Sequence, residues 1–191
     1  MKSFKTVALI TIILSLFITR VIFLKSNVFS VDGDEAILGL MALDLLDGKF
    51  PVYFYGQTYG LSLLEVFPIA IWITLFGVSN IAIKLPMLLI FGIALFFLFK
   101  TMQSIAASKK FWMPIFFILL VILSPTWLIW SLKARGGYLT SFLSSSIFCY
   151  LLFSNINREK LKTALFAILG LLLIIIFEAQ PLWLPPLIPL G

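Results

Sequence analysis

The chain is 191 residues long, and its composition excludes an ordinary soluble domain: 62% of the residues are hydrophobic, 12% are charged, and the mean hydropathy is +1.15. The net charge of +6 does not indicate nucleic-acid binding, because the lysines and arginines stand singly or in pairs at the ends of apolar segments. With one cysteine and no histidine, the sequence offers neither an internal disulfide nor a cysteine or histidine metal site. We expect an integral membrane protein. It should be all-α, because the apolar runs are too long for strands and helices satisfy their own backbone hydrogen bonds in lipid.

The first apolar segment, at 7–25, follows Lys2 and Lys5 and so has the basic start of a secretory signal. It is long enough to span a bilayer and no small-residue cleavage site follows it, so we interpret it as a retained anchor. Arg20 interrupts the segment near its far end, where we expect the long side chain to extend to the membrane interface.

About five transmembrane helices are predicted in all, at 7–25, 80–99, 111–131, 138–154 and 163–179. The apolar run Leu61–Phe76 is not counted among them, because it is marginally short and contains Glu65 and Pro68. A re-entrant or interfacial helix fits this run better. The alternative, an ordinary span joined to the next by a tight hairpin, stays open.

The basic residues of the short loops predict the topology, because lysine and arginine near membrane ends are retained on the cytoplasmic side. Two loops qualify, and their basic residues are Lys100, Lys109, Lys110, Arg158, Lys160 and Lys162. Placing both loops and the N-terminus inside requires that one of the first three apolar runs does not cross. The segment 26–79 is then extracytoplasmic, and the protein is a multi-pass protein of the cell (inner) membrane.

This extracytoplasmic segment has its own internal order. Ala36–Leu46 has the pattern of a short apolar helix that stops at Asp47-Gly48, and with Leu61–Phe76 it gives two interfacial helices. An aromatic loop bracketed by proline and glycine follows at 50–60. Its aromatic rings are typical of a membrane interface, and a sugar-stacking platform is the more specific interpretation.

Six of the eight carboxylates lie between Asp32 and Glu65, and three of them crowd into Asp32, Asp34 and Glu35. Asp32 with Glu35 fits a helix capping box. Three acids in four residues exceed what capping needs, and their repulsion favours a general base among them. Both interpretations stay open on the residues alone, as does a bound Mg²⁺ or Mn²⁺; no cofactor and no metal ligand is predicted.

Several motifs in this order resemble the GT-C glycosyltransferases, and in particular the bacterial members similar to protein O-mannosyltransferases and aminoarabinose transferases. The motifs are Asp34-Glu35-Ala36, Asp47-Gly48-Lys49, Tyr53-Phe54-Tyr55-Gly56-Gln57-Thr58-Tyr59-Gly60, Leu75-Phe76-Gly77-Val78-Ser79, Ile83-Lys84-Leu85-Pro86 and Leu132-Lys133-Ala134-Arg135-Gly136-Gly137-Tyr138. A fainter likeness extends to 177–183, so the resemblance covers most of the chain.

The resemblance implies an enzyme that transfers a sugar from a polyprenyl-phosphate donor to a hydroxyl of a lipid, glycan or protein acceptor, outside the cytoplasm. Such enzymes carry two surface helices after the first span. The resemblance makes Asp34 the general base on the acceptor hydroxyl, with inversion at the anomeric carbon, and gives Glu35 the task of orienting the acceptor. The bilayer, the donor and the acceptor are the expected partners.

A leaving phosphate needs positive charge, and Arg135 stands on an outer loop beside flexible glycines and Tyr138. Lys84 is a second candidate for binding the phosphate, although the plainer interpretation is that its side chain extends to the membrane interface. Arg135 likewise has the alternative of an interfacial anchor at a helix end. Gln57, Tyr59 and Tyr138 are candidate substrate contacts, the first two from their place in the aromatic loop and Tyr138 from its place beside Arg135. Two polar residues at the end of the last span are expected to line the same cavity: Glu178 and Gln180.

The chain departs from the family in length, since such enzymes continue for several more spans. We expect an N-terminal portion of a longer enzyme, with activity of this portion alone in doubt. Two other classes stay open: a fragment of a multi-span transporter that uses Asp32, Asp34 and Glu35 as an ion site, and a non-catalytic membrane scaffold. The sequence does not identify the sugar, the acceptor or the oligomeric state.

Overall fold

The structure is a computed structural model, and it describes residues 2–25, 30–106, 112–155 and 163–185. Within these ranges every regular element is a helix, and one isolated antiparallel bridge joins Tyr53 to Leu61. The predicted all-α class is confirmed. In chain order the elements are α1 (Lys2–Lys25), α2 (Gly33–Leu46), α3 (Leu63–Phe76), α4 (Asn80–Ile105), α5 (Trp112–Leu123), α6 (Pro125–Trp130), α7 (Tyr138–Asn155), α8 (Thr163–Ala179) and the 3₁₀ turn η2 (Pro181–Trp183).

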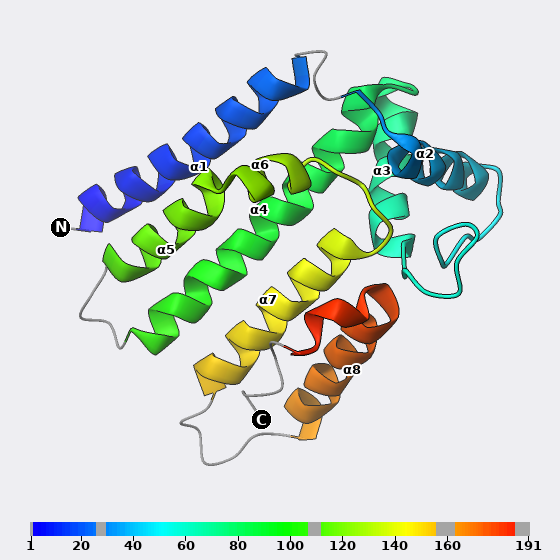
Figure 1. Cartoon of the computed structure of the whole chain (residues 1–191). Coiled ribbons are helices and arrows are strands. Elements are labelled where there is room, and N and C mark those ends of the chain that lie inside the picture. The colour runs from blue at the N-terminus through cyan, green and yellow to red at the C-terminus, as the bar shows by residue number, and fades with distance from the viewer. Residues whose placement is uncertain (1, 26–29, 107–111, 156–162, 186–191) are drawn as a thin grey trace.

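The longer helices run roughly side by side, with α4 at the centre (Figure 1). α4 packs most extensively against α7 and also contacts α1, α3 and α5, whereas α8 packs on α7. The two short helices α2 and α3 pack against each other and lie across one end of this group (Figure 1). α4 and α7 begin, and α1, α6 and α8 end, on the side of the molecule where α2 and α3 lie (Figure 1).

α4 is long and apolar enough, by length and composition, to cross a membrane, and among the described residues it is the one helix that passes this test. The other apolar helices are shorter. The predicted spans 80–99, 138–154 and 163–179 correspond to α4, α7 and α8. The predicted short helix Ala36–Leu46 lies within α2, and the run Leu61–Phe76 forms α3, which has 14 residues.

The segment 111–131, predicted as one span, is broken in the structure. α5 ends at Leu123, and α6 begins at Pro125 after an extended Ser124 with φ −61° and ψ 126°. Proline has no N–H for the helical hydrogen bond, which explains a break at this point. The prediction of a continuous helix was therefore wrong.

Arg20 of α1 lies at this break and is 2% exposed. Its Nη2 donates to the carbonyl oxygen of Ile122 at 2.6 Å, and its Nε donates to Oγ of Ser131 at 3.4 Å. The expectation that Arg20 extends to the membrane interface was wrong, because its donors satisfy acceptors at the ends of α5 and α6.

Aromatic side chains fill the core where α4, α6 and α7 meet. The ring of Trp127 contacts those of Phe91 and Phe142, with centroids 5.4 Å and 4.3 Å away, and the two phenylalanine rings contact each other at 5.8 Å. Phe91 is fully buried. Offset aromatic contacts of this kind add to the free energy of burial, so this cluster fixes α6 and the loop after it against the long helices.

The loop 131–137, between α6 and α7, fits tightly against two other segments. Gly136 and Gly137 have positive φ angles of 60° and 97°. A Cβ on Gly136 would lie 2.6 Å from the ring of Phe54, and one on Gly137 would lie 2.5 Å from the carbonyl oxygen of Ala179. Glycine is therefore required at both positions for the loop to approach the aromatic loop and the end of α8.

We predict that Gly137→Ala destabilises the fold by on the order of 1–3 kcal/mol from backbone strain alone, with the clash against Ala179 added to it. Gly170→Ala, within α8, is the matched control, because nothing lies within 4 Å of a Cβ there. Thermal unfolding in detergent measures both variants. Equal unfolding temperatures for the two would contradict the described packing of this loop.

Candidate active site

The start of α2 is fixed by two of the three clustered acids. Oδ1 of Asp32 accepts a hydrogen bond from the N–H of Glu35 at 3.1 Å, and Oε2 of Glu35 accepts one from the N–H of Asp32 at 3.0 Å. These reciprocal bonds form a complete capping box. The predicted cap at Asp32 is confirmed, and one oxygen of each carboxylate remains for another partner.

The second oxygen of Glu35, Oε1, forms an ion pair with Nζ of Lys84 from α4. Both side chains are 0% exposed, so this pair is sealed between α2 and α4. Lys84 does not snorkel, and that expectation was wrong because its ammonium group is neutralised inside the protein. Glu35 and Lys84 line neither of the two pockets of the site, so their positions do not support the predicted contacts with substrate.

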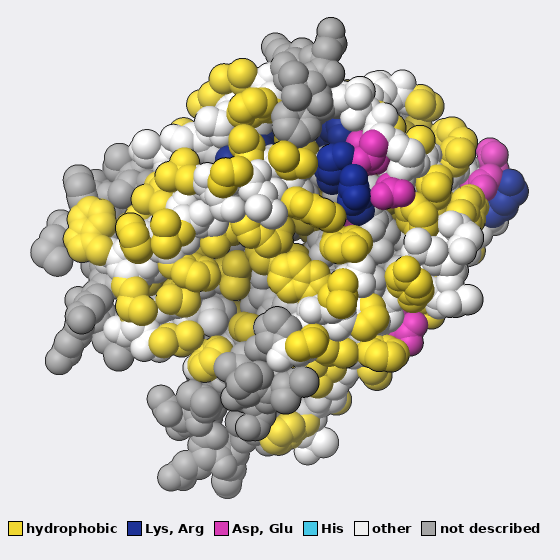
Figure 2. All heavy atoms as spheres, viewed as in Figure 1, with side chains coloured by type: hydrophobic (Ala, Val, Ile, Leu, Met, Phe, Trp, Pro, Cys, Tyr) yellow, Lys and Arg dark blue, Asp and Glu magenta, His cyan; other side chains and the backbone are white. Residues whose placement is uncertain are grey.

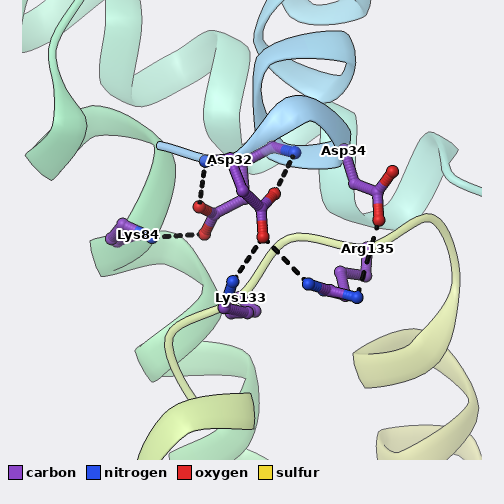
Figure 3. Close-up of polar contacts among 6 residues, drawn as sticks. Asp32, Asp34, Lys84, Lys133 and Arg135 are labelled. Atoms are coloured by element: carbon purple, nitrogen blue, oxygen red, sulfur yellow. Dashed lines mark hydrogen bonds and ion pairs between the residues drawn. The ribbon is translucent and has the colours of Figure 1, made fainter. Parts of the chain in front are cut away.

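The second oxygen of Asp32 holds two cations from the loop 131–137. Its Oδ2 pairs with Nζ of Lys133 and lies 2.9 Å from Nη2 of Arg135 (Figure 3). Burial alone would raise the pKa of Asp32, but hydrogen bonds from Lys133, the Glu35 backbone and Arg135, with the charge of Lys133, lower it to about 2. Asp32 is therefore a carboxylate at physiological pH.

Asp34 has the most exposed carboxylate of the three, with 48% of its side chain accessible. Its Oδ2 lies 3.6 Å from Nη1 of Arg135, so the guanidinium group faces Asp32 with one nitrogen and Asp34 with the other (Figure 3). An exposed carboxylate beside a fixed cation can accept a proton from an incoming group, whereas Asp32 and Glu35 are committed to the fold.

Asp34 and Arg135 line one small pocket of about 130 Å³, which we call the polar pocket. Five predicted site residues meet there, with Gln180 as a sixth that was expected in the same cavity. Its lining residues are Asp34, Phe54, Gln57, Tyr59, Arg135, Gly136, Tyr138 and Gln180. The predicted grouping of the aromatic loop, the loop 131–137 and the end of α8 is therefore present.

Glu178 does not line the polar pocket. Its Oε2 accepts a hydrogen bond from the hydroxyl of Tyr53 at 3.0 Å, and its backbone carbonyl accepts from the N–H groups of Gly60 and Leu61, both at 3.0 Å. These contacts tie both ends of the aromatic loop to the end of α8. Glu178 thus holds the wall of the pocket in place.

Glu65 of α3 holds the end of the loop 131–137 and the start of α7. This carboxylate is 0% exposed, and its Oε1 accepts hydrogen bonds from the N–H groups of Gly137, Leu139 and Thr140 at 3.0, 3.1 and 3.2 Å. These N–H groups open α7, where a negative charge is favoured by the helix dipole. Burial raises the pKa of Glu65, and the same N–H groups oppose that rise. Glu65 fixes the loop that presents Arg135.

A second, apolar cavity of about 380 Å³ adjoins the polar pocket, and we call it the aromatic pocket. Tyr138 belongs to both cavities, and the Trp130 ring lies 5.1 Å from the Tyr138 ring and 5.1 Å from the guanidinium carbon of Arg135. The lining residues are Thr126, Trp127, Trp130, Tyr138, Leu139 and Trp183. The site therefore has a charged half and an apolar half side by side.

Two residues that shape the candidate site, Lys133 and Glu65, were not predicted from the sequence. Lys133 stands two residues before Arg135, a spacing that places side chains on one side of an extended segment, and this was an available signal. Glu65 had the signal of a lone acid in an apolar run. The contacts of Lys133 with Asp32 and of Glu65 with the start of α7 join distant parts of the chain, so the sequence alone does not predict them.

Comparisons with protein-family models, curated proteins and solved structures found no match. Among the described residues, no group of three or more histidine, cysteine, aspartate or glutamate side chains could hold a metal ion. The clustered acids Asp32 and Glu35 instead face lysine and arginine side chains. The functional argument therefore rests on the geometry of the site.

We predict that Lys84→Met destabilises the fold by about 3–5 kcal/mol, because it leaves the Glu35 carboxylate buried without a counter-charge. Adding Glu35→Gln should recover part of this loss. Lys49→Met is the matched control, because the Lys49–Asp44 pair is exposed and its removal should change the unfolding temperature little. Thermal unfolding that is equally mild for Lys84→Met and Lys49→Met would show that the buried pair is not needed.

Proposed function

We propose that the chain forms the donor and acceptor site of a GT-C-type glycosyltransferase, which moves a sugar from a polyprenyl-phosphate donor to a hydroxyl acceptor. The observation that carries this proposal is that Asp34 and Arg135, an ion pair 3.6 Å apart, both line one polar pocket, next to an apolar pocket lined by tryptophans. A base, a phosphate ligand and an apolar surface are the three groups that this reaction requires.

In the proposed reaction, Asp34 takes the proton of the acceptor hydroxyl as the oxygen attacks the anomeric carbon. The bond between that carbon and the phosphate oxygen breaks on the opposite face, so the configuration inverts and the bonding electrons leave with the phosphate. Arg135 compensates the charge that builds up on the phosphate. The Asp34–Arg135 arrangement supports this division, because one group accepts protons and the other is a permanent cation.

The side chains of Gln57, Tyr59, Tyr138 and Gln180 are proposed to contact the sugar or the phosphate, since all of them line the polar pocket. Tyr59 leaves 49% of its surface accessible and thus offers a ring face for stacking on a sugar. No resident cofactor is part of the proposal. The proposed donor is a lipid-linked glycosyl group, and the proposed acceptor is a hydroxyl of a lipid, glycan or protein.

We further propose a multi-pass protein of the cell membrane in which α1, α4, α5 with α6, α7 and α8 cross the bilayer and α2 and α3 lie at the extracytoplasmic surface. The position of α2 and α3 at one end of the long helices supports this arrangement (Figure 1). So does the apolar exterior of the long helices. Large exposed hydrophobic side chains there include Leu14, Ile18, Phe116, Leu120, Phe166, Leu171 and Ile174.

We predict that Asp34→Asn lowers sugar transfer by a factor of about 10²–10⁴, because the amide cannot take the hydroxyl proton. The measurement is transfer from a radiolabelled polyprenyl-phosphate sugar in membranes that contain the chain. Asp47→Asn is the matched control at the end of the same helix, since Asp47 is exposed and does not line the polar pocket, so its removal should leave transfer unchanged. Transfer by Asp34→Asn at the parent rate, or none by the parent, would contradict the proposal.

For the topology, we predict that a cysteine at Gln57, in a Cys149→Ser background, reacts with an impermeant thiol reagent in intact cells. A cysteine at Ser104, exposed in the last turn of α4 at the other end of the molecule, should react only after permeabilisation. Labelling and mass measurement of the two variants give the result. The reverse pattern would overturn the proposed orientation.

A further inference from the structure

Asp32 pairs with two cations through a single oxygen atom. Oδ2 of Asp32 faces both Lys133 and Arg135, while Oδ1 remains in the capping box with Glu35. The two oxygens thus have separate tasks, since one begins α2 and the other neutralises the cations of the loop 131–137. The contacts of Oδ2 can be lost without loss of the helix cap.

This group of charges is open to solvent, in contrast to the other ion pair at the start of α2. The side chains of Asp32, Lys133 and Arg135 are 29%, 19% and 31% exposed, whereas Glu35 and Lys84 are both 0% exposed. Figure 2 shows basic and acidic side chains side by side within a largely apolar face, at the end that carries α2. An anion from solution can therefore reach Lys133 and Arg135 but not Lys84.

We propose that Asp32 is an internal counter-ion that occupies an anion site made of Lys133 and Arg135, and that the phosphate group of a ligand displaces it. The inference rests on the proposed function for the identity of that ligand as a prenyl phosphate. Arg135 is shared with the polar pocket, so displacement of Asp32 moves the guanidinium group from a partner in the fold to a partner in the substrate.

The chemistry of the two anions favours this exchange. The Asp32 carboxylate presents one oxygen to two cations, whereas a phosphate group presents several oxygens and so can bind the planar fork of Arg135 with two of them while a further oxygen faces Lys133. A small monovalent anion such as chloride lacks this geometry and competes poorly with a tethered carboxylate. Asp32 thus gives the empty site selectivity for phosphate.

The test is calorimetric titration of the purified chain with inorganic phosphate and, separately, with a short-chain prenyl phosphate, at fixed ionic strength. Asp32→Asn keeps a good helix cap but loses the charge, so it should bind both ligands about tenfold more tightly. Asp32→Ser, a second capping residue without charge, should behave in the same way. Asp47→Asn, which removes an exposed carboxylate at the far end of α2, should not change either affinity.

Lys133→Gln should weaken binding in both the parent and the Asp32→Asn background. Equal or weaker phosphate affinity in both Asp32 variants would overturn the inference and leave Asp32 as a cap and clamp. A higher affinity for the prenyl phosphate identifies a lipid-linked source, and equal affinities identify free phosphate. If the Asp32 variants bind phosphate more tightly but the parent chain transfers no sugar in membranes, only the proposed function is contradicted. If the parent chain transfers sugar but the Asp32 variants do not bind phosphate more tightly, only this inference is contradicted.

Discussion

The carboxylate of Asp32 joins the start of α2 to a loop 101 to 103 residues later in the chain, and this contact sets the geometry of the site in the absence of a bound anion. One oxygen begins the helix that carries Asp34, and the other holds the loop that carries Arg135. Asp34 and Arg135, the proposed base and the residue proposed to bind the phosphate, come from distant segments and are thereby held 3.6 Å apart. Without Asp32, the positive charges of Lys133 and Arg135 would repel each other across a short loop.

Two buried acids, Glu35 and Glu65, hold the helices around this contact together. Glu35 fastens α2 to α4 through Lys84, and Glu65 fastens α3 to the first turn of α7 through three backbone N–H groups. In so apolar a chain, a buried carboxyl group is costly unless it is paired or hydrogen-bonded, and these contacts offset part of that cost. Asp32, Glu35 and Glu65 thus hold elements of the fold together, whereas the side chain of Asp34 remains accessible in the polar pocket.

The features that depend on local order were predictable from the sequence: the all-α class, the capping box at Asp32 and the short helix before the aromatic loop. The order of the motifs also predicted that residues now found in the polar pocket would lie in one site. The fates of Arg20 and Lys84 were not predictable, because a lone cation near a helix end is the same pattern whether it meets lipid headgroups or a buried acceptor. Only tertiary packing supplies the Ile122 carbonyl and the Glu35 carboxylate that they bind.

The central claim is that the polar pocket receives the phosphate and the sugar of a lipid-linked donor, and its most direct test is an experimental structure with a short-chain prenyl-phosphate sugar bound. The account predicts the phosphate on Arg135 and the anomeric carbon with its open face toward Asp34, with space for an acceptor oxygen about 3–3.5 Å away. The prenyl chain should enter the aromatic pocket beside Trp130 and Trp183. A ligand bound in the apolar groove between α1, α4 and α5, with the polar pocket empty of it, would contradict the account.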